Sequence, residues 1–517
     1  MPIKSFEDDT IVQEIPLEKE PWYTIPHLRE LNLIILSLLM YSGTVGYDGS
    51  MMNGLQSLTQ WQTFMKYPTG AWLGFINAAM TLGAFITLPC QAWIADHFGR
   101  RCCLFIGLFF CALGTALQTA AYNQAMFILG RFFIGVSSAW FGIAVVLITE
   151  IAYPSHRARV TALFQCQYYL GSILAAWVTY GVRNMSNSWA WRIPSLLQIA
   201  TPILGVAGTI LSPESPRWLV SKDRAEEARS VLARFHAGGD LNSPLIAFEM
   251  AEIEQSLSLE REAKNSSSYI DMLKTKGNRH RLFITVSLGI FGQWVGNGVV
   301  SYYLFLILET IGITSVTQQT LLNGFLNVWN LILAVSAALI IDSVGRRKLF
   351  LTSCAIMLAS YITITALSGS FAQNGSKPTG IAVVPFLFIF FGGYSIAFTP
   401  ITTAYLTEIW PFALRARGVA LGSMTIYSAL LFNLFVNPIA LAAIAWKYYI
   451  VFICVLVFAI VTIYYTYPET RRFTLEEMIL VFDGKDGHVS LLPEEKENNQ
   501  QTDGSSKPSH VHMESLA

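Results

Sequence analysis

Two charged side chains stand inside long apolar segments, and they are the first candidates for chemistry in this sequence. Asp48 lies late in the apolar segment near residues 30–50, and Arg131 lies early in the one near 125–149. If both segments cross a membrane as helices in opposite directions, the two residues reach the same depth. An acid paired with arginine stays charged, whereas an acid released into apolar surroundings takes up a proton. The pair therefore predicts a site that binds and releases a proton, unless it is a static ion pair.

Uncharged amides also occur within the apolar segments, at Gln165, Gln293, Asn297, Asn330 and Asn433. An amide both donates and accepts hydrogen bonds, so amides beside aromatic rings suit a ligand with many hydroxyl groups and an apolar face. A lone Asn or Gln in a membrane helix can instead join two helices, a contact worth about 1 kcal/mol. These five residues are candidate ligands for a small, uncharged, polar molecule such as a sugar.

The composition indicates what kind of protein must position these residues. Of 517 residues, 53% are hydrophobic and 13% are charged, whereas soluble domains carry about 25% charged residues. The formal net charge is zero, so no global field favours nucleic acid as a partner. The seven cysteines lie in apolar stretches without the spacing of metal ligands, and we expect neither a metal site nor a cofactor.

Twelve apolar runs are each long enough to cross a hydrocarbon core of about 30 Å as a helix. We therefore predict an all-α, polytopic membrane protein with two pseudo-symmetric halves of six helices. The expected domains are a tail at 1–29, a first half at 30–211, an amphipathic helical linker at 212–280, a second half at 281–467 and a tail at 468–517. The predicted spans lie near residues 30–50, 70–92, 103–121, 125–149, 160–181, 193–211, 282–308, 319–341, 349–368, 381–407, 418–443 and 448–467.

Lysine and arginine are concentrated in alternate loops, and loops of that composition face the cytoplasm. This pattern places both termini and the 212–280 linker in the cytoplasm, and it predicts a multi-pass protein of the plasma membrane. The first 22 residues are polar and acidic, unlike a signal peptide. Sequons at Asn184 and Asn374 then fall outside the cell and are candidate glycosylation sites.

Three charged patterns recur about 250 residues apart, at one end of equivalent helices. Duplicated halves joined by a linker indicate a transporter that rocks one half against the other.

In the first pattern Gly99 suits a tight turn, and Asp96 caps the next helix or pairs with arginine. Acids at matched positions predict a cytoplasmic gate; the alternative is that the basic residues only set the topology. The gate residues are Asp96, Gly99, Arg100, Arg101, Glu150, Arg157, Glu214 and Arg217 in the first half, and Asp342, Gly345, Arg346, Arg347, Glu408, Arg415 and Glu469 in the second.

These patterns resemble those of the major facilitator superfamily, and specifically its sugar porter family, from about Tyr41 to Glu477. The segments GQWVGNGVVSYY (292–303), FVNPIAL (435–441) and WKYYI (446–450) are similar to the fungal lactose and cellodextrin permeases. The resemblance implies alternating access to a central sugar site in a monomer surrounded by lipid. It also implies that the charged clusters latch the cytoplasmic ends while the outside is open.

The resemblance assigns roles to individual residues in the spans. Gln165, Gln293 and Asn330 match the family's sugar-binding positions, by their spacing from the charged patterns or their place in the 292–303 segment. Tyr302 and Tyr303 resemble the tyrosines of its extracellular gate, which closes over bound sugar.

Departures from the family pattern point to the size of the substrate. Gly292 stands where the family has the first of two paired glutamines, Asn297-Gly298 stands where it has Ile-Asn, and Thr403 stands where many hexose carriers have tryptophan. Losing these side chains leaves room for a second sugar ring and favours a disaccharide. The remaining candidates for substrate binding are Asn297, Thr403, Tyr405, Tyr427 and Asn433.

The predicted function is proton-coupled uptake of a disaccharide such as lactose or cellobiose. The alternatives are a passive hexose facilitator, a transporter-like sugar receptor, and a carrier of the same fold with another cargo, such as a polyol. An enzyme is not expected, because no nucleophile–base pair or metal-ligand spacing occurs in any span.

Overall fold

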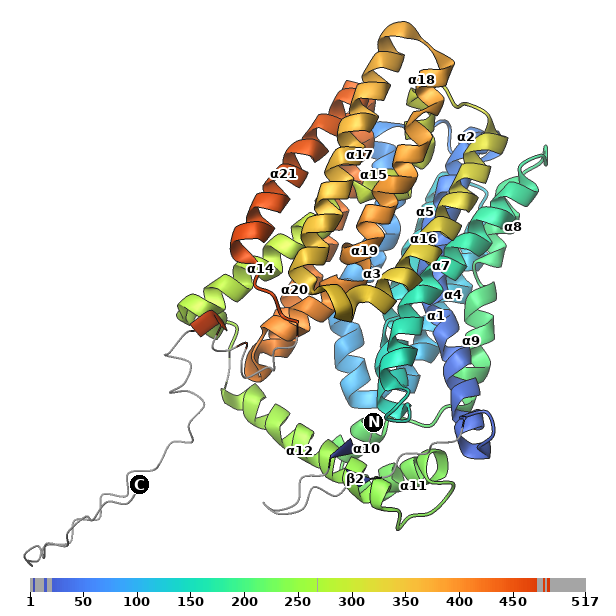
Figure 1. Ribbon diagram of the computed structural model, residues 1–517. Coiled ribbons are helices and arrows are strands. Elements are labelled where there is room, and N and C mark those ends of the chain that lie inside the picture. The colour runs from blue at the N-terminus through green and yellow to red at the C-terminus, as the bar shows by residue number, and fades with distance from the viewer. Residues whose placement is uncertain are drawn as a thin grey trace, which may run out of the picture.

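The computed structural model describes residues 3–4, 14–15, 21–266, 268–471, 478 and 481–483, and helices dominate it (Figure 1). A short antiparallel pair joins β1 (Ile3–Lys4) to β2 (Glu14–Ile15). The first group of helices is α1 (Pro26–Ser57), α2 (Thr59–Phe64), α3 (Gly70–Phe98), α4 (Arg100–Thr119), α5 (Gln124–Phe141), α6 (Ile143–Ile151), α7 (Arg157–Val182), α8 (Trp189–Leu197) and α9 (Ala200–Leu211). The linker contains α10 (Pro216–Ser221), α11 (Ala225–His236), α12 (Pro244–Ser266) and α13 (Asp271–Lys274). The last group is α14 (Lys276–Trp294), α15 (Asn297–Thr310), α16 (Val316–Val344), α17 (Arg346–Asn374), α18 (Lys377–Ile381), α19 (Val383–Ile409), α20 (Phe412–Ile444), the 3-10 helix η1 (Ala445–Tyr448) and α21 (Tyr449–Thr466).

The predicted all-α membrane fold is confirmed. Ten described segments are long and apolar enough to cross a membrane, and one of them, Phe412–Thr466, contains both α20 and α21. Because α20 and α21 are separate helices, that segment counts as two spans. A further span is α7, which is 26 residues long but carries polar side chains that lower its hydropathy. With these two additions the described helices supply the twelve spans.

Four of the spans are interrupted, although the sequence predicts each as one run. The breaks separate α5 from α6, α8 from α9, α14 from α15 and α18 from α19. The break before α15 has an identifiable cause, because Gly296 adopts a left-handed conformation with φ of 101°. The hydroxyl of Tyr361 donates to the carbonyl oxygen of Gly296 at 2.9 Å and holds the break in place.

The two groups of helices form two halves that lie side by side, with the linker helices at one end (Figure 1). We call that end the linker side and the opposite end the far side. Within the first half, α1 and α7 touch through glycines: a Cβ atom on Gly171 would lie 1.9 Å from the carbonyl oxygen of Gly43. Contact this close between backbones makes α1 and α7 a tightly packed pair.

The linker is fastened to the first half by buried polar contacts. His236 of α11 and Glu249 of α12 form a buried pair with 2.7 Å between Nδ1 and Oε2. The other ring nitrogen of His236 lies 3.1 Å from the carbonyl oxygen of Ile151, at the end of α6. Nearby, burial and the neighbouring Arg159 and His236 lower the pKa of His156. The linker therefore packs as part of the first half, on the side where the charged patterns lie.

Candidate functional site

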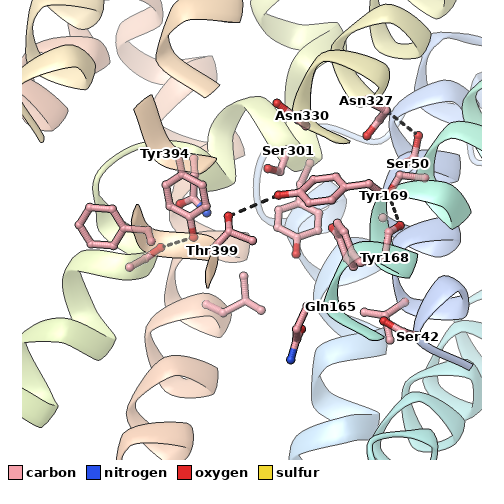
Figure 2. A pocket seen from close by; sticks show the side chains of 18 of the residues that line it. Ser42, Ser50, Gln165, Tyr168, Tyr169, Ser301, Asn327, Asn330, Tyr394 and Thr399 are labelled. Atoms are coloured by element: carbon pink, nitrogen blue, oxygen red, sulfur yellow. Dashed lines mark hydrogen bonds between the residues drawn. The ribbon is translucent and has the colours of Figure 1, made fainter. Parts of the chain in front are cut away.

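A central cavity of about 480 Å³ lies between the two halves, a size typical of small-molecule sites. Its wall comes from α1, α5 and α7 of the first half and from α14, α15, α16, α19 and α20 of the second. Figure 2 shows ten of its lining residues by name, including Gln165, Asn330 and Tyr394. Six of the eight residues predicted to bind substrate line this cavity: Gln165, Gln293, Asn297, Asn330, Thr403 and Tyr427.

The amides in the cavity wall keep hydrogen-bonding capacity for a ligand. Asn297 and Asn330 are buried, and the side-chain oxygen of each has no partner in the structure. An unpaired amide oxygen in a closed site is costly unless a donor reaches it. Gln165 projects from α7 with an exposed side chain and lines the cavity below Tyr168 in the view of Figure 2. The arrangement suits a neutral ligand that offers several hydroxyl donors.

Aromatic rings provide the apolar part of the wall, and most of them were not among the predicted residues. Tyr168 and Tyr169 follow Gln165 by one helical turn, and the hydroxyl of Tyr169 donates to Thr399 of the opposite half at 3.3 Å. Tyr394 stacks on Phe398 at 5.6 Å and donates to the carbonyl oxygen of Gly292 at 2.9 Å. These two tyrosines could have been predicted from the sequence, because residues three and four positions after Gln165 lie on the same face of a helix as Gln165.

Two predicted ligands do not line the central cavity in this structure. Tyr405 follows Thr403 by two positions, which turns it about 200° around the helix and away from the cavity. Its buried hydroxyl donates to the carbonyl oxygen of Pro468 at 2.8 Å. Asn433 donates to the backbone oxygen of Gln293, at the end of α14. It therefore supports the helix break rather than lining the cavity.

The predicted charge pair is present and buried. Arg131 Nη1 lies 3.1 Å from Asp48 Oδ1, and the side chains are 3% and 1% exposed. Arg131 also donates from Nε to the carbonyl oxygen of Ile76 at 2.9 Å. The second carboxylate oxygen of Asp48 is buried and has no hydrogen-bond partner among the described residues. Gly49 and Ser50, the next residues of α1, line the central cavity, so this carboxylate adjoins the ligand site.

Hydrogen bonds between the halves gather on the far side, and many of them start from α1. Ser50 accepts from Asn327 at 3.1 Å, and Asn53 accepts from the backbone N–H of Leu304 at 3.1 Å. Gln56 donates to the carbonyl oxygen of Tyr302 at 3.1 Å. These contacts close the far side of the central cavity.

The two predicted gate tyrosines have different surroundings. The side chain of Tyr302 lines the central cavity. Tyr303 is fully buried and donates to the carbonyl oxygen of Leu434 in α20 at 2.6 Å. Its φ of −136° and ψ of 28° depart from helical values and kink α15. Only Tyr302 is therefore placed where it can touch a ligand.

The first charged pattern forms a connected cluster on the linker side. Arg100 makes a two-pronged ion pair with Glu150, with distances of 3.1 and 3.2 Å. Glu214 accepts from the backbone N–H groups of Arg100 and Arg101 at 2.9 and 3.3 Å, which places a carboxylate on the N-terminus of α4. The side chain of Arg101 donates to carbonyl oxygens of Thr209 and Ile210, at the C-terminus of α9.

The second half repeats this cluster. Arg346 pairs with Glu408 at 3.1 Å. Glu469 accepts from the backbone N–H groups of Arg346 and Arg347 at 2.8 and 3.2 Å, at the N-terminus of α17. Gly345 precedes α17 with φ of 100°, as Gly99 precedes α4 with φ of 95°.

Asp96, Arg157 and Arg217 of the first pattern are not placed as predicted. Asp96 is exposed and does not cap α4, because Glu214 occupies that position. Arg157 begins α7 and has a buried Nε without a partner, and Arg217 pairs with Glu260 of α12 instead of with a gate acid. The guanidinium of Arg415 lies over the ring of Phe412. The side chain of Asp342 lies outside the described residues.

Replacing Gly99 with alanine should disrupt the first cluster. A Cβ atom there would lie 2.5 Å from Glu214 Oε2, and the φ of 95° is one that side chains rarely adopt. We expect Gly99→Ala to lower the free energy of unfolding by about 1–3 kcal/mol and to reduce the maximal uptake rate. Thermal unfolding of the purified protein and initial uptake rates measure the two effects. Gly181→Ala is the control, because nothing lies within 4 Å of the added atom, and equal effects of the two variants would contradict the prediction.

Comparison with known proteins agrees with this geometry. The profile of the family described as "Sugar (and other) transporter" matches residues 35–482. The chain belongs to this family. It is thereby a membrane transporter rather than an enzyme.

Relatives of this transporter include two named glucose carriers. An MFS glucose transporter of Aspergillus flavus is 29% identical over 472 residues, which are 85% of this chain and 87% of that protein. A high-affinity glucose transporter of Kluyveromyces lactis is 26% identical over 498 residues, 92% of this chain and 89% of that protein. The solved structure of the proton:xylose symporter XylE bound to 6-bromo-6-deoxy-D-glucose superposes with a TM-score of 0.70 at 22% identity, over 88% of this chain and 99% of XylE, which shows the shared fold.

Proposed function

We propose that this sugar transporter is a proton-coupled symporter that takes a sugar up across the plasma membrane by alternating access. In this proposal the linker side and both termini face the cytoplasm, and a monomer in lipid suffices. The conformation described above, closed on the far side, is then the one that faces inward. The ion pairs Arg100–Glu150 and Arg346–Glu408 are present in it, and each lies within one half, so they do not latch the two halves together as expected. The observation that carries the proposal is the buried Asp48–Arg131 pair beside the central cavity.

The proton step follows from the surroundings of Asp48. While Arg131 contacts Oδ1, its opposite charge favours the carboxylate anion. Oδ2 is buried and unpaired, so it is the atom on which a proton would be carried. Movement of α1 that separates the pair leaves a desolvated carboxylate, which binds a proton. Because α1 also lines the cavity, sugar binding and proton binding act on the same helix.

For the cargo we propose a disaccharide, with a hexose carried by a passive facilitator as the alternative. Thr403 lines the cavity where a tryptophan would fill it, and Gly292 leaves open space, since the nearest atom to an added Cβ is 4.0 Å away. Both features enlarge the site. The alternative is favoured by the glucose transporters among the relatives.

Uptake of labelled lactose, cellobiose, maltose and glucose in a transporter-deficient yeast tests cargo and coupling together. We expect a disaccharide to accumulate, and a protonophore to abolish accumulation while leaving equilibration. Glucose uptake that a protonophore does not affect would instead establish the facilitator. A receptor that signals without carrying would restore no uptake of any of the sugars.

The size of the site is tested by Thr403→Trp. The added ring would occupy the space proposed for the second sugar, so disaccharide uptake should fall by about tenfold or more, which corresponds to at least 1.4 kcal/mol. Uptake or binding of a monosaccharide should fall less. Competition by glucose and cellobiose for the same labelled substrate measures the ratio, and an equal loss for both sugars would contradict the proposal. Thr407→Trp, one turn further along α19 and outside the cavity wall, controls for the bulk of the ring.

The proposed orientation predicts glycans at Asn184 and Asn374. Both side chains are exposed on the far side, one after α7 and the other at the end of α17. Endoglycosidase treatment should increase the gel mobility of the wild-type protein, and Asn184→Gln together with Asn374→Gln should remove the shift. The sequon at Asn265, in the linker, is the control: a mobility change in Asn265→Gln would mean that the linker faces outward.

A further inference from the structure

A second cavity, which we call the outer cavity, lies between the halves on the far side. Its volume is about 580 Å³. One wall comes from the end of α1, from α2 and from the start of α3; the other comes from α15, α16 and α20. Gln56 separates the two cavities, because it lines the outer one and donates to the carbonyl oxygen of Tyr302, whose side chain lines the central one.

The lining of the outer cavity combines polar and apolar groups. Gln62 and Gln319 use their side-chain N–H groups on the backbone oxygens of Gln56 and Ile313, which leaves an amide oxygen on each as an acceptor. Glu309 adds a carboxylate. Apolar side chains, among them Phe305 and Leu441, line the same cavity. A ligand that fits this mixed lining has both hydroxyl groups and an apolar part.

An aromatic side chain is held at this cavity by an unusual backbone. Lys66 and Tyr67 are consecutive residues with φ of 57° and 53°, a left-handed conformation that is uncommon for residues other than glycine. The N–H of Tyr67 donates to the carbonyl oxygen of Gln62 at 2.8 Å, which secures the turn. The exposed ring of Tyr67 forms part of the cavity wall. Strained backbone of this kind is concentrated at ligand sites.

The outer cavity depends on the conformation of the transporter. Because its walls belong to different halves, it is complete only when the far side is closed. A ligand that touches both walls binds that conformation more tightly than one in which the halves have separated, and so it shifts the population toward closure.

We propose that the outer cavity binds an aryl glycoside, a sugar with an aromatic substituent, and thereby holds the far side closed. The sugar hydroxyls donate to Gln62, Gln319 and Glu309, and the aryl group lies against Phe305, Leu441 and Tyr67. The far side faces the medium in the proposed topology. Such a glycoside therefore reaches the outer cavity from outside the cell and inhibits uptake without competing for the central site.

The probe for this site is phenyl β-D-glucoside, titrated by calorimetry into the full-length protein in lipid nanodiscs. Ala442→Trp fills the outer cavity from the end of α20, and Ala443→Trp adds the same ring at an exposed neighbour outside the wall. We expect Ala442→Trp to weaken binding by about tenfold or more and Ala443→Trp to leave it unchanged. Tyr67→Ala, which removes bulk instead of adding it, and Glu309→Gln, which keeps the size of the side chain and removes its charge, should each weaken binding as well.

Gln165→Ala tests whether phenyl glucoside binds in the central cavity instead. We expect this variant to leave the affinity for phenyl glucoside unchanged. Loss of binding in Gln165→Ala with full binding in Ala442→Trp would overturn the proposal, as would an absence of binding to the wild-type protein. In that last case lipid is the occupant of the outer cavity. The titration requires no transport, so its result is independent of whether sugar uptake is proton-coupled. In uptake assays the expected inhibition lowers the maximal rate and leaves KM unchanged.

Discussion

Asp48→Asn should abolish accumulation of sugar against a concentration gradient. The amide of asparagine keeps the size of the side chain and can accept a hydrogen bond from Arg131, but it cannot carry a proton. In vesicles with an imposed pH gradient, the internal sugar concentration should rise no higher than the external one. Exchange of labelled for unlabelled sugar should continue, because the side chains that line the central cavity are unchanged.

Two measurements accompany this test. Sugar affinity should remain within about threefold of wild type, a difference below 1 kcal/mol. The melting temperature should fall, since a buried arginine without its partner costs up to about 3–5 kcal/mol, reduced here by the amide contact. Asp96→Asn is the matched control, because it removes an exposed carboxylate from the same half. Undiminished accumulation by Asp48→Asn would refute the coupling role.

Gly296→Ala should be the most destabilising of the glycine substitutions considered. A Cβ atom there would lie 2.3 Å from the hydroxyl oxygen of the buried Tyr361, and the φ of 101° is left-handed. Backbone strain contributes about 1–2 kcal/mol, and overpacking adds about 1–3 kcal/mol. The free energy of unfolding should therefore fall by about 2–5 kcal/mol. Chemical unfolding in detergent, followed by near-ultraviolet circular dichroism, measures the change.

A control and a double variant separate the two contributions. Gly375 has φ of 60° and nothing within 4 Å of an added Cβ, so Gly375→Ala should show the strain alone. Adding Tyr361→Phe to Gly296→Ala removes only the hydroxyl oxygen, while Cε2 and Cζ of the ring stay 2.5 and 2.6 Å from the added Cβ, so only a small part of the loss should be recovered. Sugar uptake should follow stability, because the same break positions Asn297 and Gln293 in the cavity wall. Equal losses for Gly296→Ala and Gly375→Ala would show that Tyr361 gives way.

The sequence allowed good predictions where a single residue type forces a structural response. A carboxylate in an apolar span demands a partner, and Arg131 was predicted from depth alone; the structure places it 3.1 Å from Asp48. The amides of the cavity wall were predicted because neutral amides suit a hydroxyl-rich ligand, and for Gln165, Gln293 and Asn330 also because they match the family's sugar-binding positions. The repeated charged patterns were likewise recognisable because they occur twice.

Predictions failed where the answer depended on contacts between distant segments. Asp96 lies close in sequence to α4 and was expected to cap it, yet the cap is Glu214, more than one hundred residues away. Sequence proximity favours a local cap, whereas the packing of the linker determines which carboxylate contacts the N-terminus of α4. Tyr405 was wrong for a different reason, because a residue two positions from a cavity residue lies on the opposite face of a helix. The helix break at Gly296 requires Tyr361, which belongs to another helix.

Different residues of α1 bind the proton and close the far side, and this separation has an evolutionary consequence. Within the proposed mechanism Asp48 binds the proton, while Ser50, Asn53 and Gln56 hold the far side closed through contacts that do not involve the carboxylate. Coupling can therefore be lost without dismantling the gate. A single nucleotide change converts an aspartate codon into an asparagine codon, so a proton-driven symporter and a passive carrier lie one mutational step apart.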